Sequence, residues 1–181
     1  YLYTKFNIPT MEFMGIMIIP FLIAVALITI CCCFVKNEPL NIRGQQTRLP
    51  KKRTIIYLAL FVLSILIVFR GIHYIIGLVV IPIALLFLDR NALKQVDYPL
   101  LFTFVFFFIF AGNMARIDAV INVFSYLLNK NTLVFSTLSC QCISNVPSAI
   151  LLSQFAENYP QLLVGVNIGG CGTIISSLAS L

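Results

Sequence analysis

Two short polar segments interrupt the apolar last third of the chain: SNVP at 144–147 and GGCGT at 169–173. A Ser-Asn pair before Pro favours the start of a helix, and a run of glycines breaks one. The N–H groups at a helix start attract anions, whereas carbonyl groups at a helix end suit a cation such as Na⁺. Side by side, the two segments would hold an anion and a cation without a buried lysine or arginine.

The region around the first segment is too polar for one uninterrupted membrane span. As a single helix, residues 131–155 would place Ser, Gln and Asn side chains near the bilayer centre, where they are costly unless protein or water satisfies them. Two half-helices over 132–142 and 147–156, joined by 143–146, would each be about 15 Å long, half of a bilayer. The pattern therefore predicts a re-entrant hairpin with its tip at the midplane.

The second segment predicts a broken helix that faces the hairpin. Residues 161–168 form one half-helix, and the glycines of 169–172 end it. Thr173 would cap a second half-helix that runs to Leu181. Four helix ends would then meet at the midplane of the membrane.

Both segments also have simpler interpretations. Asn145 would cap an ordinary helix with Pro147 in its first turn, where the missing N–H costs nothing. Glycines in membrane helices often serve only close packing between helices. The adjacency of the two segments and their half-bilayer spacing favour a binding site over these alternatives.

Composition indicates a membrane protein. Of the 181 residues, 60% are hydrophobic and 10% are charged, whereas a soluble domain carries about a quarter charged residues. Six of the twelve basic residues lie within 36–53, between two apolar runs, which the positive-inside rule explains better than nucleic-acid binding does. We therefore expect a cytoplasmic loop there and no nucleic-acid partner.

An enzyme and a dedicated metal centre are not expected. No nucleophile–base pair is visible, His73 is the only histidine, and the six cysteines lack the spacing of a zinc site. Apart from a coupling Na⁺, no cofactor is predicted.

The predicted fold is an all-α polytopic membrane protein with about five membrane-spanning helices, a re-entrant hairpin and a broken helix. Residues 1–35 hold the first span, 36–53 the basic loop, and 54–130 three spans followed by an amphipathic helix. That helix would lie at the membrane interface or pack on protein. Residues 131–181 hold the hairpin, the broken helix and the binding region.

Two strings, CISNVPSAILLSQF and LLVGVNIGGCGTIISSLASL, make the region from about 137 to 181 resemble the ion transporter superfamily. That family includes citrate-type and dicarboxylate–sodium permeases, arsenite-pump subunits and NhaD-type sodium/proton antiporters. The resemblance implies two inverted repeats, of which this chain would supply most of the second. Dicarboxylate members typically have Thr after Ser-Asn; here Val146-Pro147 follows, as in the arsenite and citrate-like branch, which weakens the case for a dicarboxylate and for Na⁺.

The resemblance also assigns roles to the polar residues. Ser144 and Asn145 would contact substrate and coupling ion, while the facing loop would be lined by Asn167, Gly169, Gly170 and Thr173. Na⁺ would be held at Ser144, Asn145, Gly170 and Thr173.

The predicted function is secondary active transport of a small citrate-, dicarboxylate- or arsenite-like anion, coupled to Na⁺ or H⁺ by alternating access. We expect a multi-pass protein of the cell (inner) membrane. The alternatives are a Na⁺/H⁺ antiporter of the same fold and a non-transporting structural membrane subunit. The chain begins at Tyr1 and ends in a helical pattern, so we expect it to be a piece of a longer protein. Its expected partners are the anionic substrate, the lipid bilayer, the missing half of the transporter and, because family members often dimerise, a second copy.

Overall fold

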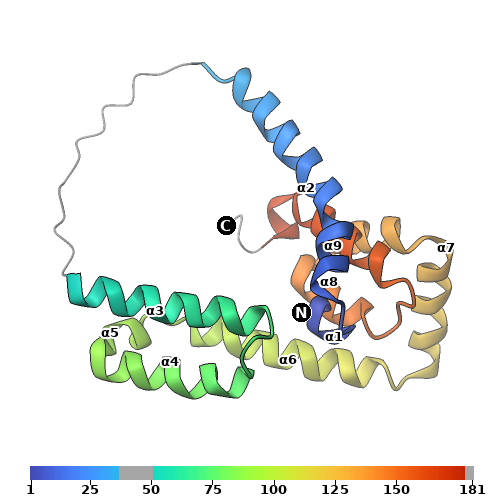
Figure 1. Ribbon diagram of the computed structural model, residues 1–181. Coiled ribbons are helices and arrows are strands. Elements are labelled where there is room, and N and C mark those ends of the chain that lie inside the picture. Colours follow the sequence, from blue (N-terminus) through green and yellow to red (C-terminus); the bar gives the residue numbers. More distant parts are fainter. Residues whose placement is uncertain (37–50, 178–181) are drawn as a thin grey trace. The chain divides into compact units, whose positions relative to one another are not determined.

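The computed structural model describes residues 1–36 and 51–177, and all regular structure in these ranges is helical (Figure 1). Most of the predicted basic loop and the predicted helix end at Leu181 lie outside the described residues. The helices are α1 (Leu2–Lys5), α2 (Thr10–Cys33), α3 (Lys51–Val68), α4 (Tyr74–Leu88), α5 (Arg90–Lys94), α6 (Tyr98–Met114), α7 (Asp118–Ile143), α8 (Asn145–Leu152), α9 (Tyr159–Gly170) and the 3₁₀ turn η1 (Ile174–Ser176).

Helix α2 is the clearest candidate for a membrane span in the part of the chain that the structure describes. It is 24 residues long and has a mean hydropathy of 2.9, and none of its residues is buried. Helices α6 and α7 meet at a 97° bend and count as a second span if they are one broken element. Helices α3 and α4 are apolar but shorter, so these ranges contain one or two clear spans, and the five-span count stays a prediction.

The described residues of the range 36–98 form one of two compact units. In it, α3 and α4 pack as an antiparallel pair, and Gly77 of α4 lies directly against the Ile67 side chain of α3. The carboxylate of Asp89 caps α5. It accepts hydrogen bonds from the Tyr57 hydroxyl at 3.0 Å and from the Ala92 N–H at 3.3 Å, and these bonds hold the pKa of Asp89 below its usual range.

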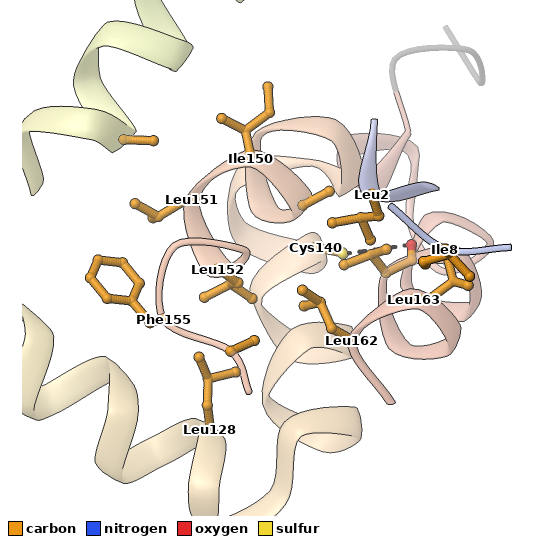
Figure 2. Close-up of a cluster of buried hydrophobic side chains, with 14 residues drawn as sticks. Leu2, Ile8, Leu128, Cys140, Ile150, Leu151, Leu152, Phe155, Leu162 and Leu163 are labelled. Atoms are coloured by element: carbon orange, nitrogen blue, oxygen red, sulfur yellow. Dashed lines mark hydrogen bonds between the residues drawn. The ribbon is translucent and has the colours of Figure 1, made fainter. Parts of the chain in front are cut away.

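The second unit, residues 1–35 and 99–181, contains the buried core and the candidate site. Its centre is α8, in which six of the eight residues, Pro147 to Leu152, are buried. Figure 2 shows Leu152 of α8 beside Leu128 and Leu162, which come from α7 and α9. The short, largely buried α8 thus packs against both α7 and α9.

The first half of α7 is the predicted amphipathic helix, and it packs on protein. Val120, Ile121 and Phe124 lie against the core, and the ring of Phe124 stacks on Phe155 with centroids 5.1 Å apart. Asn122, on the polar face, is exposed. The sequence predicted that this helix would lie at the membrane interface or pack on protein, and within this unit it packs on protein.

The second half of α7 and the whole of α9 lie unusually close together. Gly165 and Gly169 of α9 are four residues apart and face α7. A Cβ atom on Gly165 would overlap the Ser136 hydroxyl and lie 2.8 Å from Leu133 O, and one on Gly169 would lie 2.7 Å from Cys140 Cβ. Small residues at this spacing allow two helix backbones to approach within membranes.

Short side chains cross this narrow interface to backbone oxygens. The Thr137 hydroxyl is shared between Leu133 O in its own helix, at 2.8 Å, and Gly165 O of α9, at 3.1 Å. The Cys140 thiol lies 3.8 Å from Val166 O, the contact drawn as a dashed line in Figure 2. The α7–α9 interface is thus held by packing and by hydrogen bonds from α7 to α9.

Replacement of Gly165 by Ala tests this packing. Because the new methyl group meets the backbone oxygen of Leu133, we expect the free energy of unfolding to fall by about 1–3 kcal/mol, the usual cost of overpacking. Gly112→Ala is the matched control, since a Cβ there would have no neighbour within 4 Å. Thermal unfolding of the purified protein in detergent measures both, and equal midpoints for the two variants would contradict the close packing.

Candidate functional site

The hairpin tip is a single residue, Ser144. Helix α7 ends at Ile143 and α8 begins at Asn145, so the break lies inside the predicted 143–146 segment but is shorter. Ser144 has φ 72° and ψ 157°, a combination that is almost confined to glycine and costs about 1–3 kcal/mol. Such a conformation persists only when the surroundings hold it.

Hydrogen bonds to α7 and to η1 hold Ser144. Its N–H donates to Cys140 O at 3.0 Å, which continues the α7 pattern, and its hydroxyl donates to Ser176 O at 3.3 Å. Ser144 occupies the N-cap position of α8, without a side-chain capping bond, so Asn145 is not the cap. The Ser144 hydroxyl bonds to η1 instead of to α8.

Helix α9 ends at Gly170, and residues 171–173, here called the unwound stretch, lead into η1. Thr173 occupies the N-cap position of η1, but its side chain makes no capping bond, so the predicted capping role of its side chain is wrong. Its N–H donates instead to Gln141 Oε1 at 3.1 Å. The buried hydroxyl of Ser176 donates to Thr173 O at 2.6 Å and to Gly170 O at 3.3 Å.

The hairpin tip and the end of α9 meet. Besides the bond from Ser144 to Ser176, the Asn145 side chain lies over Gly170, where an added Cβ would be 2.7 Å from Asn145 Nδ2. We call this meeting of residues 144–145 with Gly170 and Ser176 the tip site. It brings together three of the six predicted ligands, namely Ser144, Asn145 and Gly170.

The other three predicted ligands have different surroundings. Gly169 is buried against Cys140, which gives it a packing role. Asn167 is exposed, and its amide donates to Leu163 O one turn back in α9 at 2.7 Å. Thr173 is exposed and is joined to the hairpin through its backbone N–H.

Neutral groups build the tip site. Within the described range 131–177 the one charged side chain is Glu157, in the α8–α9 connection. The first N–H groups of α8 have no acceptor inside that helix, and they present the positive end of its dipole, whereas the end of α9 is negative. The arrangement suits an anion beside Asn145 and a cation beside the carbonyl of Gly170.

A conventional metal centre is absent from the part of the chain that the structure describes. No three His, Cys, Asp or Glu side chains come together there. A cation at the tip site would therefore be held by hydroxyl, amide and carbonyl oxygens, which are ligands of hard cations such as Na⁺.

A polar cavity of about 310 Å³ lies at the other end of the hairpin, where α7 bends at Asn131 and the α8–α9 connection reaches α9. Asn131 and Asn158 cap the helix starts there, accepting from Val134 N–H at 3.0 Å and from Gln161 N–H at 3.1 Å. Its lining residues are Leu128, Asn129, Lys130, Asn131, Thr132, Glu157, Asn158 and Gln161. This cavity is separate from the tip site.

Two curated proteins are similar to this chain. "Uncharacterized transporter MJ0456" of Methanocaldococcus jannaschii is 39% identical over 132 residues, which are 72% of this chain and 36% of that protein. "Inner membrane protein YbiR" of Escherichia coli is 33% identical over 108 residues, 58% of this chain and 29% of that protein. No family model and no solved structure matches the chain.

The chain spans about a third of the length of the curated relatives it matches. One relative is named a transporter and the other an inner membrane protein, so the similarity agrees with a membrane protein. Neither name states a substrate or a coupling ion.

Sequence reasoning missed the residues that hold the site together. From the sequence, Gln141 is only one of several polar residues that a continuous span over 131–155 would bury, and neither Ser136 nor Gly165 stands out. The available signals were the four-residue spacing of Gly165 and Gly169 and the same spacing of Ser136 and Cys140. These pairs predict which faces of α7 and α9 meet.

The strained backbone at Ser144 has a direct test. Ser144→Gly and Ser144→Ala both remove the hydroxyl, but only glycine relieves the positive φ, so we expect the glycine variant to be more stable by about 1 kcal/mol or more. At Ser148, inside α8, the order should reverse, because glycine destabilises a helix interior by about 0.5–1 kcal/mol relative to alanine. Thermal midpoints of the four variants measure this, and the same order at both positions would contradict the strain at Ser144.

Proposed function

We propose that this chain is part of a secondary transporter that moves a small anion, coupled to Na⁺ or H⁺, by alternating access. The observation that carries the proposal is the meeting of the hairpin break at Ser144 with the end of α9 at the tip site. There the Ser144 hydroxyl donates to Ser176 O, and the Asn145 amide lies over Gly170. Discontinuous helices whose ends converge in this way are the usual binding sites of ion-coupled transporters.

The exposed surface of the apolar helices supports a membrane setting. Large side chains along α2, α3, α4 and α6 are exposed, among them Phe87 at 78% and Phe106 at 65%. Surface of this extent and character is covered in a working protein by lipid or by further helices. The name of one relative, an uncharacterized transporter, supports transport as the general activity, and the name of the other, an inner membrane protein, supports the membrane setting.

The finer assignment follows the resemblance to the ion transporter superfamily. In this proposal the chain supplies one inverted repeat, and the rest of the protein supplies the other hairpin and broken helix. Asn145 and the first N–H groups of α8 bind the anion. Ser144, Gly170 and Thr173 contribute oxygens to the coupling cation, with Asn167 at the exposed edge.

Asn145→Ala tests the anion site. Loss of an amide that bonds an anion costs about 1.5–3 kcal/mol, so we expect the KM for uptake to rise about tenfold or more, with the amount of protein in the membrane unchanged. Uptake of labelled citrate, succinate and arsenite into proteoliposomes with an imposed Na⁺ or proton gradient measures this. Asn122→Ala, on the exposed face of α7, is the matched control, and wild-type uptake by the Asn145 variant would contradict the assignment.

The same vesicles separate the proposal from its two alternatives. Exchange of Na⁺ for H⁺ without any added anion would favour an antiporter of the same fold. A structural subunit would show no flux, and Asn145→Ala and Gly170→Ala would then change assembly with other subunits. Anion uptake driven by one of the two gradients is the result that the proposal expects.

A further inference from the structure

Gln141 connects the hairpin to both sides of the break in α9. It lies on α7, three residues before Ser144, and is half-buried. Its Nε2 donates to Gly169 O at 2.8 Å, and its Oε1 accepts from the Thr173 N–H at 3.1 Å. One side chain therefore satisfies a carbonyl in the last turn of α9 and an N–H at the far end of the unwound stretch.

A primary amide suits this double contact. It carries a donor and an acceptor on one rigid plane and has no charge. A carboxylate would only accept, and an ammonium group would only donate. In a site built from neutral groups, Gln141 thus holds the break without introducing a charge.

The backbone of the unwound stretch runs directly against this amide. A Cβ on Gly172 would lie 2.6 Å from Gln141 Nε2. Gly172 is exposed on its other side. The amide of Gln141 and the bare backbone of Gly172 therefore fit one another, and a side chain at 172 would push the amide away.

We propose that Gln141 is a positioning residue for the tip site. By holding Gly169 O and Thr173 N–H it fixes the backbone from 170 to 173 in the conformation that binds the small anion or its coupling cation beside Asn145. Its own donor and acceptor are both taken by the backbone, so it acts through the unwound stretch. This inference rests on the function proposed above.

Hydrogen–deuterium exchange and transport together test the proposal on the full-length protein. Gln141→Met removes these two hydrogen bonds and a third, from Nε2 to Thr137 O at 3.3 Å within α7, and keeps a side chain of similar length. We expect the amides of 171–176 to exchange about fivefold faster, the factor for one lost net hydrogen bond. We also expect the KM to rise about fivefold or more for whichever of citrate, succinate and arsenite the wild-type protein takes up, with Vmax per folded molecule changing less.

Gly172→Ala is a second variant, useful if Gln141→Met folds poorly. It leaves Gln141 in place but displaces its amide, at an exposed position where folding is less at risk. The same rise in exchange and in KM is expected. Gln95→Met, at an exposed turn in the other unit, is the matched control and should leave both measurements unchanged.

Either of two results overturns the inference. Wild-type exchange of 171–176 in Gln141→Met or Gly172→Ala shows that the amide does not hold the stretch. Faster exchange with an unchanged KM shows that the stretch does not position the ligand. If the wild-type protein takes up none of the three anions, the proposed function fails, and ligand positioning by Gln141 fails with it, whereas the exchange data still decide whether the amide holds the stretch.

Discussion

The close approach of α7 and α9 is the constraint on which the candidate site depends. Gly165 and Gly169 remove the side chains that would keep the two backbones apart, and the small residues Ser136 and Cys140 face them. At this separation a side chain as short as Thr137 reaches a carbonyl of the opposite helix. Nearer the tip, the hydrogen bond from Gln141 to Gly169 O joins the same two helices.

The strained tip is a consequence of that packing. A serine at positive φ is unfavourable by itself, but Ser144 follows directly from a helix fixed on α9 and precedes a helix that is buried along most of its length. Between two fixed helices, one residue must make the whole turn. The same geometry places the Asn145 side chain, at the start of α8, over Gly170 at the end of α9, so the strain and the placement of the helix ends have one cause.

The sequence predicted where the helices break better than how the breaks are held. The backbone preferences of Pro147 and of the glycines of 169–172 are local properties of these residues. The sequence could therefore predict the position of each break without knowing which helix lies beside it. The role of Gln141 was not, because its amide acts only once α9 lies beside it. Gly169 shows the same limit. The sequence alone does not distinguish a glycine that ends a helix from a glycine that lets two helices touch, and the Cys140 side chain opposite Gly169 shows that it does the second.

The neutrality of the tip site has a physical rationale if the protein works by alternating access. A carrier that returns without its substrate changes conformation twice in each cycle, once with the site loaded and once with the site empty. In both steps the site lies inside the membrane. A lysine or arginine there would be stabilised by a bound anion but would be a costly unpaired charge in the empty site. Helix ends, hydroxyls and amides attract ions through dipoles, and several of them also bond to one another, as the Ser144 hydroxyl does to Ser176 O and the Gln141 amide does to the Thr173 N–H. In such a carrier, a site made of these groups is therefore tolerable in both states.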